Sequence, residues 1–383
     1  MRIGFVCTRF FPPDGAVSGI EVFVLTLAER LQRLGHHPVV IASATAGWHG
    51  PVPDSVGGIP VYRFAESRIR PRLLSHRLQY QGMVERIVRE GKLDLVECCD
   101  ESGVLLAKRF ACPLVVRMHQ NSSVRLKLMR RPPSPMGTFF ERRLLRMADA
   151  RVGVSDWVAR ITLETAGLKY LDYRVIYNGV DTTLFAPARG IESDADLILF
   201  AGQLSDRKGL DTLFNAIPTV MLHYPGTRLR CVGANQKKPG HPSPAERYIA
   251  MIPSPLRSRV DFAGEVTHER MPDEFRHAGL CVFPSRFEGH PVVVLEAMAC
   301  GAPVIFMKDG VGPEVINHGE DGLLCDTRDP AAIASTIMEA LASPSLRLRL
   351  GARARQKVED SFSLDKATDE NLHFYEGLVN GTK

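Results

Sequence analysis

Short apolar runs that suit buried strands alternate with helical periodicity along almost the whole chain. This alternation constrains the fold strongly, because strands separated by helices favour a parallel sheet with helices on its faces. Between the first two runs, apolar residues from Ile20 to Leu34 recur at helical spacing, and Gly35 suits the end of that helix. The strand-like runs of the first half are 3–7, 39–42, 93–97, 114–118, 150–154 and 174–177.

The same pattern begins again in the second half, with strand-like runs at 197–201, 228–232, 260–263, 280–283, 303–306 and 322–325. A chain of 383 residues is too long for one ordinary domain and fits two of roughly 150–200 residues. We therefore expect two similar α/β domains, residues 1–185 and 186–361, facing an interdomain cleft. Ligands of open α/β sheets bind at the carboxyl ends of strands, so this cleft is the expected site.

One segment places Glu288 and Glu296 eight positions apart, across the junction between a strand-like run and a helix. Pro291 suits the first turn of that helix, where its missing N–H costs nothing. Glu288 is then expected at the helix mouth and Glu296 more than a turn inside. The N–H groups near Val292 and Val293 would attract oxygen-rich, anionic ligands. The alternative is a surface loop with one glutamate near the helix dipole and the other in solvent.

A second segment, 201–209, also runs from a strand end into a helix and carries Gln203, Arg207 and Lys208. A lysine at a helix start adds a full positive charge to the free amides and suits a diphosphate. The alternative is a solvated lysine near a helix cap.

Two segments of the first half also follow strand-like runs. The small residues of 11–19, including Ser18 and Gly19, let backbone N–H groups approach an anion closely. This segment lacks the GxGxxG pattern, and the chain has no Walker sequence, so binding of a dinucleotide or ATP is not favoured. The alternative, which the segment alone favours, is a plain turn. His119 follows the run 114–118 and suits hydrogen bonding to a hydroxyl-rich ligand or proton transfer. A purely structural histidine is the alternative.

The net charge of +5 is unevenly distributed. Residues 1–185 hold 26 Lys and Arg against 17 Asp and Glu, whereas the remainder holds 22 against 26. The excess lies in segments 63–92 and 124–146, where basic and apolar residues interleave. Such segments suit an anionic membrane or an anionic acceptor, or are an ordinary solvated basic face. No nucleic-acid-binding motif accompanies them, so we expect no nucleic acid.

Cysteines and hydropathy set the compartment that we expect. The eight cysteines lack metal-ligand spacing, and most lie in apolar runs, which is typical of reduced, buried thiols. No stretch approaches the roughly 20 apolar residues that span a bilayer. No carboxylate pair stands out as a divalent-cation site. We expect a cytoplasmic protein with no bound metal.

Several motifs together resemble the retaining glycosyltransferases of family 4, which have the GT-B fold of two Rossmann-like domains. The stretches that carry the resemblance follow the family's order: FPPDGAVSGIEVFVLTLAERL from Phe11, VGVSDWVAR from Val152, VIYNGVDTTLFAP from Val175, AGQLSDRKGLD from Ala201, FEGHPVVVLEAMACGAPV from Phe287 and EVINHGEDGLL from Glu314. The resemblance covers nearly the whole chain, from about 3 to 375.

The resemblance implies a role for each of these residues. Glu288 would meet hydroxyls of the donor sugar, Glu296 would bind the nucleotide ribose, and the amides after His290 would hold sugar or phosphate oxygens. Lys208 would grip the diphosphate, and His119 would lie beside the transferred sugar. The loop at Ser18 and Gly19 would approach the diphosphate from the other domain, and a last helix, 362–383, would complete the first domain. Lysine and helix amides would replace a metal ion, and no cofactor is implied.

Two positions depart from the family pattern. Gln203 stands where the family usually has arginine, and losing one such contact to a leaving group costs about 2–4 kcal/mol in the transition state. Arg207 or Arg9 would then have to supply the missing charge. His290 stands where Phe or Leu is common, which would retune the sugar pocket.

The expected activity is retaining transfer of a hexose from a nucleotide diphosphate sugar to an acceptor hydroxyl, in bacterial polysaccharide or glycolipid biosynthesis. A catalytically weak nucleotide-sugar-binding protein, and a GT-B phosphorylase or epimerase, are the alternatives. The basic first half favours a lipid-linked or otherwise anionic acceptor, with peripheral contact at the inner membrane face.

Overall fold

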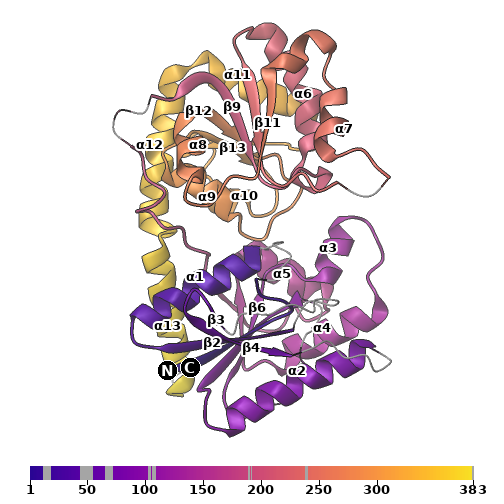
Figure 1. The fold of residues 1–383 in the computed structure, drawn as a ribbon, viewed down its shortest axis with the longest axis vertical. Coiled ribbons are helices and arrows are strands. Elements are labelled where there is room, and N and C mark those ends of the chain that lie inside the picture. Colours follow the sequence, from indigo (N-terminus) through magenta and orange to yellow (C-terminus); the bar gives the residue numbers. More distant parts are fainter. Residues whose placement is uncertain are drawn as a thin grey trace. The chain divides into compact units, whose positions relative to one another are not determined.

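Two α/β units make up the chain, Met1–Asn178 with Ala367–Lys383, and Gly179–Lys366 (Figure 1). They are seen in a computed structural model that describes residues 1–11, 19–43, 55–64, 72–101, 105, 109–188, 190, 192–237 and 240–381. In each unit, helices flank a sheet whose strands are mostly parallel, which confirms the predicted GT-B class of two Rossmann-like domains.

Within the described residues, the sheet of the first unit has the strand order β3-β4-β2-β1-β5-β6-β7-β8, and only β3 runs antiparallel to its neighbour. Its strands are β1 (Arg2–Cys7), β2 (His37–Ser43), β3 (Ser55–Val56), β4 (Ile59–Phe64), β5 (Leu95–Cys99), β6 (Leu114–Met118), β7 (Ala150–Gly153) and β8 (Arg174–Val175). The helices are α1 (Gly19–Arg33), α2 (Arg72–Arg89), α3 (Ser122–Leu128), α4 (Pro135–Met147), α5 (Asp156–Thr165) and most of α13 (Leu364–Val379).

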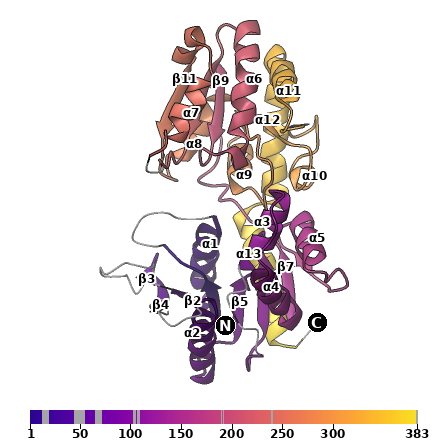
Figure 2. The same cartoon turned by 90° about the vertical axis from the view of Figure 1, so that its right-hand side faces the viewer.

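Alternate side chains of β1 enter two different cores, as the period of two in a strand requires. Phe5 packs with residues of α1 and with Tyr375 of α13, whereas Val6 packs with residues of α2, α4 and α5. Helices α1 and α13 therefore cover one face of this sheet, and α2, α4 and α5 cover the other. Figure 2 shows α3 and α4 on the opposite side of this unit from β3 and β4.

Strands β3 and β4 are absent from the sequence prediction. They form a hairpin around Gly57 and Gly58, which both have positive φ, and β4 then pairs in parallel with β2. The strand reads IPVYRF, so a proline and an arginine interrupt the apolar run that marks the other strands.

Within the described residues, the sheet of the second unit is parallel throughout, in the order β11-β10-β9-β12-β13-β14. Its strands are β9 (Asp194–Ala201), β10 (Arg228–Val232), β11 (Val260–Gly264), β12 (Ala278–Val282), β13 (Val304–Met307) and β14 (Leu323–Cys325). The order corresponds to 3-2-1-4-5-6 in the numbering of a dinucleotide-binding sheet. The order reverses between β9 and β12, which places a topological switch point there.

The helices of the second unit form two groups. Helix α6 contacts α11, whereas α9 contacts α8 and α12. The α-helices are α6 (Leu210–His223), α7 (Pro244–Ala250), α8 (Met271–His277), α9 (Val292–Ala299), α10 (Gly312–Val315), α11 (Pro330–Ala342) and α12 (Pro344–Ser361). Two short 3₁₀ helices are η2 (Asp206–Lys208) and η3 (Ser254–Arg259).

The unit boundaries differ by a few residues from the predicted ones. The sequence placed them at 185/186 and 361/362, whereas the structure divides at 178/179 and 366/367. Arginines of the second unit hold the connecting segment: the Nε of Arg276 donates to the carbonyl of Ala186 (2.7 Å), and the Nη1 of Arg355 donates to that of Phe185 (2.7 Å). The segment therefore belongs to the second unit.

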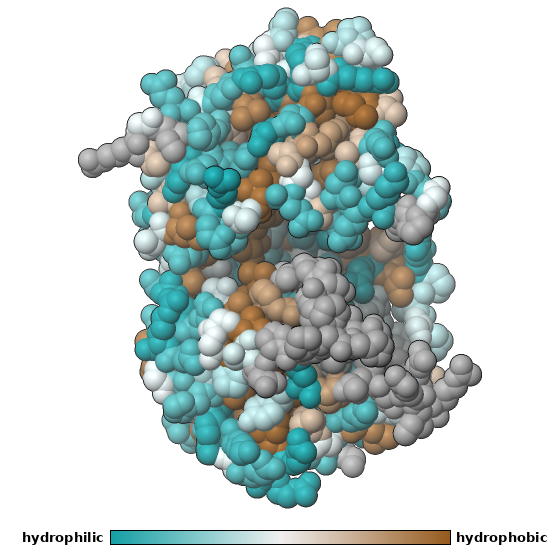
Figure 3. Space-filling view, viewed as in Figure 1, coloured by the Kyte–Doolittle hydropathy of each residue, from teal (hydrophilic) through white to brown (hydrophobic). Residues whose placement is uncertain are grey.

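The surface seen in Figure 3 is mostly hydrophilic, with separate apolar patches. All eight cysteines are free; Cys112 is half-buried and the other seven are buried. In the part of the chain that the structure describes, no helix is both long enough and apolar enough to cross a membrane.

Candidate active site

The switch point of the second sheet brings two predicted segments into contact. The loop after β9 ends at Gly209, whose φ is 74°, and a Cβ there would lie 1.8 Å from the carbonyl oxygen of Pro284 in the loop after β12. Only glycine permits this approach, because any side chain would collide with that backbone. The close packing brings Lys208, at the end of the first loop, to Glu288 in the second.

Lys208 and Glu288 form an ion pair with 2.6 Å between Nζ and Oε1. The hydroxyl of Ser285 donates to the same carboxylate oxygen at 2.7 Å. Burial by itself would raise the pKa of Glu288, but the positive charges of Lys208 and Arg207 and these hydrogen bonds outweigh it and leave the pKa below its usual value. Glu288 is therefore an ionised carboxylate that can accept hydrogen bonds.

Gln203 and Arg207 flank this pair. Gln203 is exposed, and it lies between Gly202, whose φ is 145°, and Leu204, which is buried. Arg207 is half-buried, with its Nη1 3.9 Å from Oε2 of Glu288. The second unit thus places two cations at one carboxylate.

Helix α9 begins at Val292, four positions after Glu288. Pro291 is its N-cap residue, with no side-chain cap, so the prediction that Pro291 lies in the first turn is wrong by one position. The N–H groups of Val292 and Val293 have no carbonyl of their own helix to bind, as in any first turn. Glu296 lies more than a turn inside the helix, as predicted. His290, just before Pro291, is buried, and this burial lowers the pKa of His290 to about 3 and keeps its ring neutral.

The corresponding edge of the first unit holds the other predicted residues. Gly19 is the first residue of α1 and is exposed, whereas Ser18 lies outside the described residues. The buried carboxylate of Glu21 accepts the backbone N–H of Phe11 (2.8 Å) and the Nε of Arg9 (3.1 Å). Arg9 is therefore bound to a carboxylate of its own unit.

His119 directly follows β6 at the carboxyl edge of this sheet. Its ring meets that of Phe23 edge-on, 5.2 Å between centroids. Burial and the nearby charge of Arg117 lower its pKa to about 3, so the imidazole is neutral at physiological pH. Gln120, the next residue, has a φ of 94°, which is rare for a residue with a side chain.

A buried carboxyl group holds this turn. The Oδ1 of Asp100, after β5, accepts the backbone N–H of His119 at 3.0 Å. Its Oδ2 has no hydrogen-bond partner in the described part of the chain. Burial raises the pKa of Asp100 to about 8, so at neutral pH it is mostly a neutral acid beside a neutral imidazole.

Two family models match most of the chain. The model described as "Glycosyltransferase Family 4" matches residues 17–184, and the one described as "Glycosyl transferases group 1" matches residues 195–343. The chain belongs to glycosyltransferase family 4.

Named relatives agree with this family. The D-inositol 3-phosphate glycosyltransferase of Xylanimonas cellulosilytica is 29% identical, with 95% of this chain and 93% of the relative covered. The enzyme of the same name from Kineococcus radiotolerans is 27% identical, with 96% and 92% covered. Among solved structures, sucrose-phosphate synthase from Thermosynechococcus elongatus superposes with a TM-score of 0.82 at 22% identity, covering 99% of each chain. Anabaena HepE in complex with UDP and glucose gives 0.77 at 20% identity, covering 99% of this chain and 100% of that one.

His268 contacts the predicted site residue Glu296, and the sequence did not reveal this partner. Its Nε2 lies 3.1 Å from Oε1 of Glu296, and its ring packs edge-on against that of Phe185 at 5.0 Å. The hydrogen bond to Glu296 raises the pKa of His268 above its usual value, although burial opposes this. The histidine stands 28 residues before its partner and in no motif, so only the fold reveals the pair.

Arg117 is a second residue whose environment was not predicted. It is fully buried in the first unit, where its Nε and Nη2 bind the carboxylate of Glu97 at 2.6 and 2.9 Å. Asn371 and Tyr375 of α13 complete the network around the same guanidinium. This network attaches the last helix of the glycosyltransferase to its first sheet.

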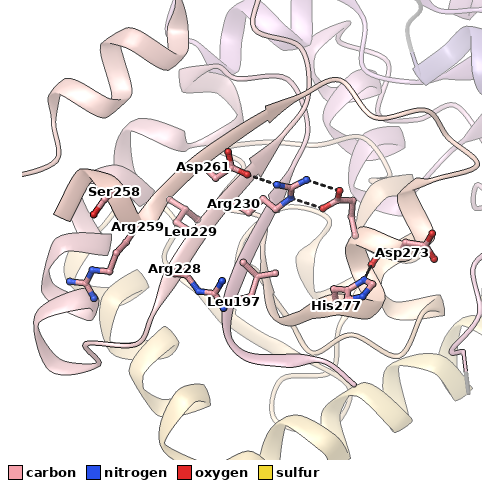
Figure 4. A pocket seen from close by; sticks show the side chains of 10 residues that line it. Leu197, Arg228, Leu229, Arg230, Ser258, Arg259, Asp261, Asp273 and His277 are labelled. Carbon is pink, nitrogen blue, oxygen red and sulfur yellow. Dashed lines mark hydrogen bonds and ion pairs between the residues drawn. The ribbon is translucent and has the colours of Figure 1, made fainter. Parts of the chain in front are cut away.

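A cavity of about 470 Å³ lies at the amino ends of β10 and β11, away from the loops just described (Figure 4). Figure 4 shows Arg230 bonded to carboxylates, which belong to Glu274 (2.8 and 2.9 Å) and Asp261. Arg228 pairs with Asp194 in the same way. Both of these arginines are paired with carboxylates, and the third lining arginine, Arg259, donates to the backbone carbonyls of Pro225 and Met221.

Proposed function

We propose that the chain transfers a hexosyl group from a nucleoside diphosphate sugar to an acceptor hydroxyl with retention of the anomeric configuration. The observation that carries the proposal is the Lys208–Glu288 pair at the switch point, next to the open N-terminus of α9. Ligands bind at switch points, and anions bind at helix N-termini.

The donor would bind with its charged and uncharged parts on different groups. Lys208, Arg207 and the N–H groups of Val292 and Val293 suit the diphosphate, whose negative charge grows as it leaves. Glu288, held ionised, suits donor-sugar hydroxyls. Glu296 suits the paired ribose hydroxyls, and His268 would fix its orientation.

His119 would supply a hydrogen bond rather than a positive charge. Its pKa of about 3 leaves a neutral imidazole at physiological pH, which can donate to or accept from a sugar hydroxyl. The loop at Ser18 and Gly19 would contact the diphosphate from the first unit, and His290 would shape the sugar pocket.

In the reaction, the bond from the anomeric carbon to the diphosphate oxygen breaks while the bond to the acceptor oxygen forms on the same face. The acceptor's proton passes to the departing diphosphate. We propose that Lys208 and the helix amides stabilise that diphosphate without a metal ion or cofactor, since they already supply positive charge where it is needed.

The similar solved structures support the proposed class of donor, and the names of the relatives support the proposed class of acceptor. The HepE structures contain UDP and UDP-glucose, and the named relatives act, by their names, on an inositol phosphate. The basic first half of this chain fits an acceptor that is likewise anionic, free or lipid-linked, in bacterial polysaccharide or glycolipid synthesis. Reduced cysteines fit a cytoplasmic enzyme acting at the inner membrane face.

A panel of nucleoside diphosphate sugars tested by thermal shift, followed by transfer assays with phosphorylated and lipid-linked acceptors, tests this function. We expect one donor to stabilise the protein, transfer in the presence of EDTA, and a product with the donor's anomeric configuration by NMR. Sugar release that requires phosphate and no nucleotide would overturn the proposal in favour of a phosphorylase.

Gln203 favours one second candidate, a nucleotide-sugar-binding protein with weak catalysis, since a neutral amide stands where a charge would help the leaving group. Tight donor binding by calorimetry, without transfer to any acceptor and without donor hydrolysis, would support that candidate.

A further inference from the structure

We infer that the α3–α4 hairpin is a docking surface for an anionic bilayer. The α3–α4 hairpin, residues 122–147, consists of α3, a reversal at Arg130 and α4, and it lies on one side of the first unit (Figure 1). The inference localises the membrane contact that the proposed function only suggests, and it can be tested independently of transfer.

The charge of the hairpin is one-sided. Its only acidic residue, Glu141, is buried at 2% exposure and accepts the backbone N–H of Ser122. The hairpin's basic side chains, in contrast, are all exposed or partly exposed: Arg125, Lys127, Arg130, Arg131, Arg142, Arg143 and Arg146. An outer face with arginines and no exposed acid attracts anionic headgroups, and each basic residue strengthens binding to such a surface about fivefold.

Large apolar side chains are exposed on the same hairpin. Met129, Met136 and Phe139 are 44%, 54% and 59% exposed. Phe139 also lines a cavity of about 540 Å³ with Arg142, Arg143, Arg146 and Met147. A soluble anionic acceptor would need the arginines alone, whereas apolar residues among basic ones suit the headgroup region of a membrane.

The hairpin is held in shape by its own contacts. Asn121 caps α3 by accepting the N–H of Val124 (2.9 Å), and Ser134 caps α4 by accepting that of Gly137 (3.3 Å). At the reversal, the N–H of Arg131 donates to the carbonyl of Leu126 at 2.8 Å. The exposed side chains are therefore presented from an ordered backbone.

Helix α12 of the second unit provides a matched control. It also exposes arginines four positions apart, Arg349 and Arg353, and an apolar residue, Leu348, which is 74% exposed. Its arginines, however, line a cavity together with the carboxylates of Glu320, Asp321 and Asp360. The same residue types there should not favour an anionic surface.

The experiment is sedimentation of the full chain with vesicles of phosphatidylcholine, with or without phosphatidylglycerol, at low and physiological salt. We expect binding that requires phosphatidylglycerol and weakens with salt. Arg142→Gln with Arg146→Gln should reduce the partition coefficient about 25-fold, since two basic residues are lost. Arg349→Gln with Arg353→Gln should leave it within twofold.

Insertion of an apolar side chain into the bilayer is measured separately from the effect of charge. Phe139→Trp should give a blue-shifted emission with anionic vesicles, and Leu348→Trp should not. Circular dichroism and the donor-induced thermal shift should match wild type in all variants, which separates this inference from the donor site. Equal losses in the α4 and α12 variants, or wild-type binding that is indifferent to phosphatidylglycerol, would overturn the inference.

Discussion

The two glutamates of the candidate site in the second unit differ in charge from Asp100 and His119 at the carboxyl edge of the first sheet. In the second unit, both glutamates have a basic partner: Glu288 is ion-paired with Lys208, and Glu296 accepts a hydrogen bond from His268 and raises its pKa. In the first unit, Asp100 is buried without a cation and is mostly protonated at neutral pH, and His119 is neutral. Two arginines near this edge are already bound to other groups: Arg117 to Glu97 and to helix α13, and Arg9 to Glu21.

This difference indicates what each edge is suited to bind. A lysine that is paired with a carboxylate can bind a polyanion instead, because a phosphate can replace the carboxylate as its partner. Neutral groups at the first edge can donate to or accept from hydroxyls without a charge imbalance. Charge stabilisation would then come from the second unit and hydroxyl positioning from the first.

If the second edge stabilises the leaving diphosphate, the largest effect of a substitution on kcat is expected at Lys208. Lys208→Ala should lower kcat about 10²–10³-fold, since one preformed donor to the leaving group is lost. Lys208→Arg should retain part of the activity, and Lys237→Ala, at an exposed lysine of the same unit, should match wild type. Steady-state transfer assays at saturating donor measure this. If the kcat of Lys208→Ala lies within threefold of wild type, Lys208 does not stabilise the leaving group, and the second edge has no such role in the reaction.

The next effect concerns the charge that Gln203 lacks. Gln203→Arg should raise kcat about tenfold, below the full value of such a contact because its surroundings are not built for arginine. Arg207→Gln tests the competing explanation. If Gln203→Arg changes nothing while Arg207→Gln abolishes turnover, Arg207 already supplies the missing charge.

A stability difference is expected at Asp100. Its pKa in the fold is about 8 against an ordinary value of 3.8, so the folded state binds the proton more tightly and stability falls as pH rises between these values. Asp100→Asn keeps an acceptor for the N–H of His119 and lacks this loss. Its melting temperature relative to wild type should rise by about 10 °C between pH 5 and pH 8.5.

The control for Asp100 is Asp172→Asn, at an exposed carboxylate of the same unit. Differential scanning calorimetry across the pH range should show no such trend for that variant. A constant offset between Asp100→Asn and wild type at all pH values would mean that Asp100 is ionised in the fold, and the contrast between the two edges would be lost.

The sequence predicted the strands and strand ends because their causes are local. Buried parallel strands are apolar runs, and all of the strand-like runs correspond to strands of the structure, whereas β4 escaped detection because Pro60 and Arg63 interrupt it. Partners distant in sequence were not predictable. Tyr375 reaches Glu97 across 278 positions, and nothing near either residue marks the pair.

The smallest effect is expected at His268, and it tests whether the second edge uses paired charge throughout. The pKa of His268 is raised by Glu296, so the stabilisation from this pair is complete below the ordinary value of 6.5 and is lost as pH rises through the folded value. Nucleoside diphosphate affinity in wild type should therefore weaken a few-fold between pH 6 and pH 9. His268→Gln should bind a few-fold more weakly at pH 6 and show little pH dependence.

Isothermal titration calorimetry with a nucleoside diphosphate measures both trends. His277→Gln is the matched control, because His277 is an exposed histidine of the same unit whose Nδ1 lies 2.7 Å from a carbonyl of its own helix. If His268→Gln retains the wild-type pH dependence, the titrating group lies elsewhere. The carboxylate of Glu296 would then be oriented by helix α9 alone, and paired charge would be confined to Lys208 and Glu288.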